Sequence, residues 1–229
     1  MNNTLIKIEN ITKVYGTKVK TNVLKGINLE IKENSINWIV GASGSGKTTL
    51  LNIISGLDTQ TTGKIYFKNN DISNLSEKEK ALFRSKNLGF VFQFHYLLPE
   101  YTALENVLMP LRIQKIKITE YYKNYAIDLL NSVGLNHVYN HYPKEMSGGE
   151  QQRTAIIRAV IATPELIIAD EPTGNLDSDS ANQVYNIIRT LHKKHNKTFI
   201  IVTHDKINPL KDERIITLKD GEIIKDVTY

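Results

Sequence analysis

The stretch "INWIVGASGSGKTTLLNII", residues 36–54, places a glycine-rich loop between two apolar runs. The first run is typical of a buried strand, and the second suits a helix. The loop, Gly41–Thr48, has the pattern of one glycine, four residues and then Gly-Lys-Thr. Glycines let the backbone curl so that successive N–H groups converge on a phosphate at the positive end of the following helix. The stretch therefore predicts an α/β fold whose strand–loop–helix unit binds a nucleoside triphosphate.

Two side chains of this loop have separate expected roles. We expect Lys47 to reach the β- and γ-phosphates, and the Thr48 hydroxyl to coordinate Mg²⁺. A glycine-rich turn that matches by chance is the alternative, but the flanking strand and helix are those that the motif requires. The residues expected to bind the triphosphate are Gly41, Ala42, Ser43, Gly44, Ser45, Gly46, Lys47, Thr48 and Thr49.

A second apolar run, "LIIADE" at residues 166–171, ends in two carboxylates. A buried strand delivers its last residues beside the loop that follows a neighbouring parallel strand. We expect Asp170 to hold the hydration shell of Mg²⁺, and Glu171 to orient or deprotonate the attacking water. The alternative is a strand end that meets solvent, which a phosphate loop in the same chain disfavours.

The segment "MSGGEQQR", residues 146–153, opens a helical pattern with two glycines. Ser147 fits a helix N-cap, and glycines in the first turn cost about 1 kcal/mol each in helix stability. Backbone access to an anion would offset that cost. This segment predicts a second anion site, which either binds a different anion or completes the site of another molecule. A plain Ser-Gly-Gly turn is the alternative.

The order of patterns along the chain predicts one core with two additions. Ile27, Leu29 and Ile31 alternate with polar residues, which is typical of antiparallel strands with one wet face. From residue 93 to about 163 the apolar spacing is mainly helical, and buried strands and a C-terminal hairpin follow. We predict a phosphate-loop (P-loop) NTPase core of α/β class, with an antiparallel β subdomain and a helical subdomain inserted over about 93–163. The whole chain, 1–229, is expected to be one domain.

Composition limits the classes of protein to consider. Of the 229 residues, 41% are hydrophobic and 23% charged, as in an ordinary globular protein. The chain has no cysteine, which excludes disulfides, thiolate zinc sites and cysteine nucleophiles. The net charge of +5 is spread along the chain, so we expect no nucleic-acid partner. A mild attraction to anionic lipid headgroups stays open.

Over essentially its whole length the sequence resembles the ATP-binding subunits of ABC transporters. Their signature "LSGGQ" corresponds here to "MSGGE", residues 146–150. The resemblance implies a head-to-tail homodimer of ATPase subunits, in which each signature caps the ATP held by the partner's phosphate loop. Ser147, Gly148, Gly149 and Glu150 are the residues implied in this trans site. Glutamate at 150 departs from the family, and we expect it to be tolerated because the anion site rests on Ser147 and the glycine backbone.

Other positions match the family in order. Gln93, which ends "LGFVFQ", resembles the glutamine that senses Mg²⁺ and the γ-phosphate, and His204, after "TFIIVT", resembles the switch histidine. Tyr15, in "KVYG", stands where the family stacks an aromatic ring on adenine, although it could equally be a core residue. The loop implied to cross the dimer interface is Asn175, Leu176 and Asp177.

The resemblance also implies the reaction, which is Mg²⁺-dependent hydrolysis of ATP to ADP and phosphate. The implied catalytic residues are Lys47, Glu171 and His204. The residues implied at the metal are Thr48, Gln93 and Asp170.

A finer resemblance lies in "FQFHYLLPEYTALENVLMPL", residues 92–111. It is similar to the lipoprotein-releasing ATPases and, slightly less, to their macrolide-export and cell-division relatives. That branch implies integral membrane permease partners and a peripheral position on the cytoplasmic face of the inner membrane. Lipoprotein release is the expectation, with macrolide or peptide export, a purely mechanical role, or a non-transport ABC ATPase as alternatives.

The same stretch has more apolar side chains than a free loop needs. They are Phe94, Tyr96, Leu97, Leu98 and Tyr101. We expect them to form a docking groove for a helix of the membrane partner. Internal packing against the helical subdomain is the alternative.

Overall fold

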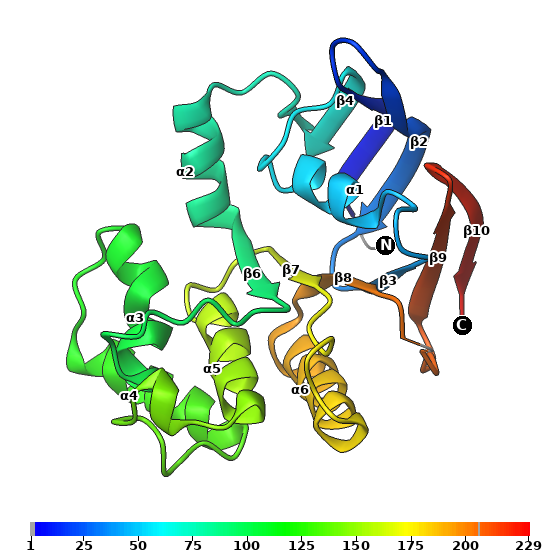
Figure 1. Ribbon diagram of the computed structural model, residues 1–229. Coiled ribbons are helices and arrows are strands. Elements are labelled where there is room, and N and C mark those ends of the chain that lie inside the picture. Colours follow the sequence, from blue (N-terminus) through cyan, green and yellow to red (C-terminus); the bar gives the residue numbers. More distant parts are fainter. Residues whose placement is uncertain (1–2, 206) are drawn as a thin grey trace.

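The computed structural model describes residues 3–205 and 207–229, arranged around two β-sheets (Figure 1). The strands are β1 (Thr4–Tyr15), β2 (Thr21–Lys32), β3 (Ile36–Val40), β4 (Thr62–Phe67), β5 (Asn70–Asp71), β6 (Leu88–Phe92), β7 (Leu166–Asp170), β8 (Thr198–Thr203), β9 (Glu213–Lys219) and β10 (Glu222–Thr228). The helices are α1 (Lys47–Ile54), α2 (Glu77–Asn87), α3 (Ala103–Ile113), α4 (Glu120–Ser132), α5 (Gly148–Val160) and α6 (Ser178–His195), with a 3₁₀ turn η1 (Pro143–Glu145).

The larger sheet has the strand order β10-β9-β3-β8-β7-β6. Strands β9, β3, β8, β7 and β6 run parallel to one another, and the edge strand β10 pairs antiparallel with β9. Parallel strands need crossover connections, and the chain supplies helices for several of them. As a result, the carboxyl ends of β3, β6, β7 and β8 meet at one edge of the sheet.

The central strands are nearly all apolar because both of their faces are buried. Trp38 of β3 packs into the same core as Phe199 of β8, on the side of the sheet that α5 and α6 cover. The adjacent residues Ile39 and Ile200 point to the opposite face, where they pack in the core of α1 and the smaller sheet. The alternation of faces follows from the two-residue period of a strand.

The smaller sheet is antiparallel, with the order β2-β1-β4-β5. Ile27, Leu29 and Ile31 are buried and alternate with exposed residues, as their spacing predicts. The β9–β10 hairpin turns at Asp220 and Gly221, whose φ values are 49° and 81°. It closes on the phosphate loop, because the amide of Gly221 donates to the Ser45 carbonyl oxygen at 3.1 Å.

Helices α3, α4 and α5 lie between β6 and β7 in the sequence and stand to one side of the larger sheet (Figure 1). Thr102 caps α3 through a capping box with Glu105. The preceding helix α2 is not foreseen by the sequence patterns, because it is mostly polar and buries only Lys80 and Phe83. The predicted fold class, a P-loop core with an antiparallel β subdomain and an inserted helical subdomain, is confirmed by this architecture.

Candidate active site

A cavity of about 700 Å³ opens where the four parallel strands β3, β6, β7 and β8 end. Each strand delivers one part of its wall, since open α/β sheets place ligand sites at the carboxyl ends of their strands. The lining residues are Val23, Ser43, Gly44, Gly46, Lys47, Thr48, Thr49, Gln93, Asp170, Glu171 and His204. Ten of these eleven are residues that the sequence singles out for the triphosphate, the metal or catalysis.

The phosphate loop is shaped by its glycines. Gly44 and Gly46 have φ values of 76° and 101°, which residues with a side chain rarely adopt. Gly41 faces the backbone of β9 so closely that a Cβ atom would lie 2.2 Å from the Leu218 carbonyl oxygen. Around Gly44 a Cβ atom would meet nothing within 4 Å, so the loop is open on the side that faces the cavity.

Lys47 folds back inside this loop. Its ammonium donates to the carbonyl oxygens of Gly41 at 2.8 Å and Ala42 at 3.0 Å, and the residue is buried. These bonds hold a positive charge at the cavity wall, at the N-terminus of α1, where the helix dipole also favours an anion. The loop therefore presents the charge and the open backbone that a phosphate requires.

The donor atoms expected for Mg²⁺ lie together. The Thr48 hydroxyl donates to a carboxylate oxygen of Asp170 at 3.4 Å, across the gap between α1 and β7. Burial, and then the neighbouring charge of Glu171, raise the pKa of Asp170, which a bound cation would counteract. The described residues contain no group of three His, Cys, Asp or Glu that could hold an ion by themselves. These oxygen donors fit Mg²⁺, which usually keeps water and takes few protein ligands.

Glu171 and His204 meet although 33 positions separate them in the sequence. Strands β7 and β8 pair in parallel, so the residues that follow them emerge side by side, and Nδ1 of His204 contacts Oε2 of Glu171. Glu171 has a φ of 49°, which costs a non-glycine residue about 1–3 kcal/mol. Its amide donates to the Val202 carbonyl oxygen at 2.9 Å, which fixes this turn. The carboxylate is thus held at the cavity, where it could accept a proton from water.

Gln93 lies at the cavity and touches the loop after Glu171. Its amide nitrogen donates to the Asn175 side-chain oxygen at 3.4 Å, and the Asn175 amide donates to the Gln93 carbonyl oxygen at 3.2 Å. Gly174 allows this approach, since a Cβ atom there would lie 2.7 Å from the Gln93 side-chain nitrogen. Asp177 then caps α6 by accepting from the amides of Asp179 and Ser180.

The signature segment, Met146–Glu150, lies away from the cavity, and its residues are absent from the cavity wall. Ser147 is the N-cap of α5 and is exposed. Glu150 completes a capping box, accepting from the Ser147 amide and hydroxyl, both at 2.8 Å. His137 contacts the other carboxylate oxygen at 2.8 Å. Leu176 lies beside the segment, because a Cβ atom at Gly148 would be 3.9 Å from its Cδ2.

Tyr15 also lies outside the cavity wall, at the end of β1, and is 41% exposed. The alternative of a core residue is therefore wrong for this tyrosine. Its hydroxyl donates to Asp58, and Lys13 lies over its ring.

Three further residues support the site and carry no sequence pattern of their own. The buried Gln152 of α5 donates its side-chain N–H to the Pro172 carbonyl oxygen at 2.6 Å, and its Oε1 accepts from Nδ1 of His95 at 2.6 Å. Arg158, on the same helix, donates to the carbonyl oxygens of His95 and Tyr96. Helix α5 therefore holds the segment after β6 and the segment after β7 at once.

The profile of the "ABC transporter" family matches residues 24–174. This chain belongs to the ABC transporter family.

Similar ABC proteins cover nearly the whole chain. The "lipoprotein-releasing system ATP-binding protein LolD" of Cytophaga hutchinsonii is 45% identical over 96% of this chain and 99% of its own length. The protein of that name from Pseudoalteromonas translucida is 46% identical over 97% of this chain and 96% of its own length. A solved dimer of the ATP-binding cassette MJ0796, in a post-hydrolysis state bound to ADP and phosphate, is 39% identical with a TM-score of 0.87 and covers 98% of both chains.

These findings place the chain among the ATP-hydrolysing subunits of ABC transporters. Within the described part of the chain, none of the helices has both the length and the apolar character of a membrane span.

Proposed function

We propose that the chain powers the release of lipoproteins from a membrane, as the ATPase subunit of a transporter whose other subunits are integral membrane permeases. The full-length similarity to two proteins named LolD carries the choice of cargo. The cavity at the ends of β3, β6, β7 and β8 supports the ATPase chemistry. The chain would then lie on the cytoplasmic face of the membrane as a peripheral subunit.

In the proposed reaction, the backbone of Gly41–Thr48 and the ammonium of Lys47 bind the phosphates of ATP. Thr48 and Asp170, with Gln93, would hold Mg²⁺, which neutralises charge on the transferred phosphoryl group when bound. Glu171 orients the attacking water and accepts its proton, and His204 holds this carboxylate in place and approaches the γ-phosphate. Positioning and charge stabilisation account for most of the rate enhancement in such a site.

The proposed complete site needs a second copy of the chain. Ser147 and the amides of Gly148 and Gly149 lie on another helix than the phosphate loop and outside the cavity. We therefore propose a head-to-tail dimer in which this segment binds the ATP of the partner, while residues 175–177 cross the interface. On this view the chain is a single ABC ATPase domain, with the helical subdomain of about 93–163 carrying the signature.

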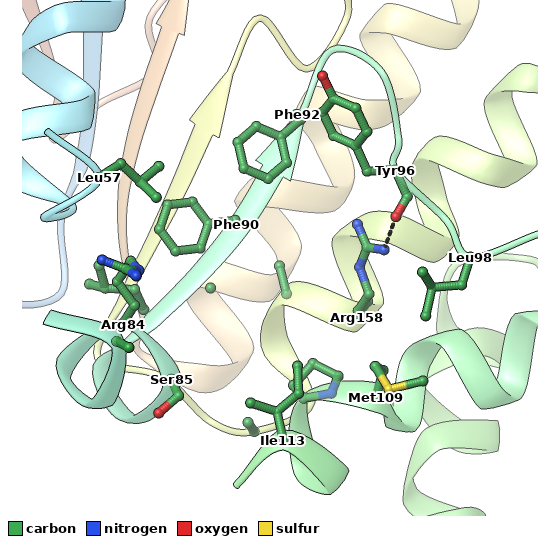
Figure 2. A pocket seen from close by; sticks show the side chains of 16 residues that line it. Leu57, Arg84, Ser85, Phe90, Phe92, Tyr96, Leu98, Met109, Ile113 and Arg158 are labelled. Carbon is green, nitrogen blue, oxygen red and sulfur yellow. Dashed lines mark hydrogen bonds between the residues drawn. The ribbon is translucent and has the colours of Figure 1, made fainter. Parts of the chain in front are cut away.

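A groove along the edge strand β6 supports the proposed permease contact. It has a volume of about 540 Å³, and mostly apolar side chains from β6, the following segment and α3 line it (Figure 2). They include Phe90, Phe92, Tyr96, Leu98, Met109 and Ile113. Tyr96 is 65% exposed and Ile113 is 64% exposed, which is unusual for large apolar residues gathered in one place.

The alternative of internal packing holds for only part of this stretch. Leu97 packs against the core of the helical region, whereas Phe94, Tyr96 and Leu98 are exposed. Figure 2 shows Arg158 bonded to the Tyr96 carbonyl oxygen, so the backbone beside the groove is held by α5. An apolar helix of a permease fits a groove of this kind.

The contact can be tested with a matched pair of exposed isoleucines. Ile113→Asp, in the groove, should keep ATP binding and abolish co-purification with the permease. Ile224→Asp, on the edge strand β10 with a similar exposure of 59%, should leave both unchanged. Equal permease binding by the two variants would contradict the groove assignment.

The cargo can be tested in liposomes that contain the chain with the permease that co-purifies with its Glu171→Gln variant. We expect ATP to release an embedded lipoprotein into solution, and the Glu171→Gln complex to release none. ATP hydrolysis stimulated by a macrolide or a peptide, with no lipoprotein released, would contradict the proposed cargo while keeping the ATPase assignment.

A further inference from the structure

The ring of Tyr15 is fixed at one edge by a short hydrogen bond. Its hydroxyl donates to Oδ2 of Asp58 at 2.5 Å. Asp58 follows the end of α1, and its amide donates to the Asn52 carbonyl oxygen at 3.1 Å. The turn that follows α1, the helix that starts at the phosphate loop, therefore carries the residue that holds Tyr15.

One face of the same ring is covered by a cation. The ammonium of Lys13 lies 4.6 Å from the ring centroid of Tyr15. It also donates to Oδ1 of Asp58 and to the Thr59 carbonyl oxygen, both at 2.6 Å, and the Lys13 side chain is 11% exposed. Because its bonds fix the ammonium, only the opposite face of the ring is left for a ligand.

Neighbouring contacts make this cluster part of the rigid sheet. The Thr59 amide donates to Oδ1 of Asp58 at 2.7 Å, and the Val14 amide donates to the Thr61 hydroxyl at 2.9 Å. Burial alone would raise the pKa of Asp58, but hydrogen bonds from Lys13, Tyr15 and the Thr59 amide hold the pKa below its usual value. The carboxylate therefore stays ionised and keeps its three donors at neutral pH.

We propose that Lys13 and Asp58 are positioning residues that hold the ring of Tyr15 with one face free to stack on the base of ATP. The inference rests on the proposed role of Tyr15 in the adenine contact. A ring that is already oriented loses less conformational entropy when it stacks, so the pair raises affinity for the base and leaves phosphate binding unchanged. The Lys13–Asp58 pair would thereby increase the ratio of the affinity for ATP to the affinity for a polyphosphate without a base.

The test compares two ligands on the full-length chain in the Glu171→Gln background, so that ATP is not consumed. Dissociation constants are measured by calorimetry for ATP and for inorganic tripolyphosphate, which has no base. Tyr15→Phe removes the hydroxyl but keeps the ring, Asp58→Asn removes the charge, and Lys13→Met removes the cation. Lys7→Met is the control, because Lys7 also lies on β1 and pairs with Glu9.

We expect each of the three variants to bind ATP about two- to tenfold more weakly, the range that ordering one side chain costs. Their affinity for tripolyphosphate should match that of the parent, as should both affinities of Lys7→Met. The double variant Tyr15→Phe, Asp58→Asn should bind ATP no more weakly than the weaker single variant, since Asp58→Asn already weakens the bond that Tyr15→Phe removes. Unchanged ATP affinity in all three variants, or equal losses for both ligands, would overturn the proposal.

Tyr15→Ala in the same assay separates this inference from the function on which it rests. A loss for ATP alone in Tyr15→Ala, with no loss in Tyr15→Phe or Asp58→Asn, overturns the positioning role only. An unchanged ATP affinity in Tyr15→Ala overturns the adenine contact itself, and the positioning role with it.

Discussion

Two glycine-rich helix starts in this molecule have opposite surroundings. At α1, Gly46 provides no side-chain cap, and the phosphate loop lies against Asp170 and Gln93 in a cavity of its own chain. At α5, Ser147 caps the helix, is exposed, and lies outside that cavity. The first start has the Lys47 ammonium and the carboxylates of Asp170 and Glu171 around it. The second has the Glu150–His137 pair and, beside Gly149, the side chain of Arg153.

This difference indicates that the phosphate loop and the signature segment have different roles in ATP binding. The phosphate loop has the charge, the open backbone and the expected metal donors within one chain, because the start of α1 and the ends of neighbouring strands meet at one cavity. The signature segment lies outside the cavity, and the Ser147 hydroxyl takes part in the capping box with Glu150 of its own chain. We propose that a second copy supplies the ATP molecule on which this segment acts. The predictions that follow test the two regions separately.

The largest effect is expected inside the cavity. Glu171→Gln should lower the turnover number at least about 100-fold, because general base catalysis contributes two to four orders of magnitude. ATP affinity should remain within a few-fold of the parent, since the phosphate loop is untouched. Phosphate release and calorimetry measure the two quantities. Turnover above a tenth of the parent rate would contradict the role of Glu171.

The second-largest effect on turnover is expected at the signature segment. Ser147→Arg should lower turnover at least about tenfold, because it blocks a site that transition-state charge stabilisation requires. A single chain should bind ATP as before, because Ser147 lies outside the cavity.

The matched control for this variant is Ser76→Arg. Ser76 is also exposed and caps α2 by the same capping box, with Glu79. Both variants lose a cap worth about 1 kcal/mol of stability, so their melting temperatures should fall alike. Equal turnover in the two variants would show that Ser147 acts only as a cap.

The smallest effect on turnover is expected at position 150, where this chain has glutamate and the family signature has glutamine. Glu150→Gln should change turnover by less than about twofold, because an amide oxygen still accepts from the Ser147 amide and completes the capping box. Steady-state kinetics measures this directly. A loss of tenfold or more would mean that the carboxylate of Glu150, with His137, acts on the partner's nucleotide.

Local features of the site can be predicted from the sequence, whereas contacts between distant segments cannot. The phosphate loop is local, so spacing alone predicts where Lys47 and Thr48 lie. The caps at Thr102 and Ser147 are local too. The meeting of Glu171 with His204 depends on β8 pairing beside β7, which no local period encodes, and only the family resemblance indicates it.

Other contacts escape the sequence for the same physical reason. Asp58 and Lys13 are 45 positions apart and meet because β4, the strand that follows Asp58, pairs with β1. Gln152 joins the ends of two strands from a helix whose pattern shows only an amphipathic face. Long-range hydrogen bonds of buried polar side chains leave no periodic trace.

The most direct test of the central claim mixes two defective chains. Lys47→Ala disables the phosphate loop and Ser147→Arg disables the signature, so each variant alone should hydrolyse ATP at no more than about a tenth of the parent rate. If the signature acts on the partner's ATP, a mixed dimer has one intact site, and an equal mixture should recover about a quarter of the parent activity, because half of the dimers are mixed and each has one working site of two. If the mixture stays as inactive as its components while mixed dimers form, the signature does not serve the partner's ATP.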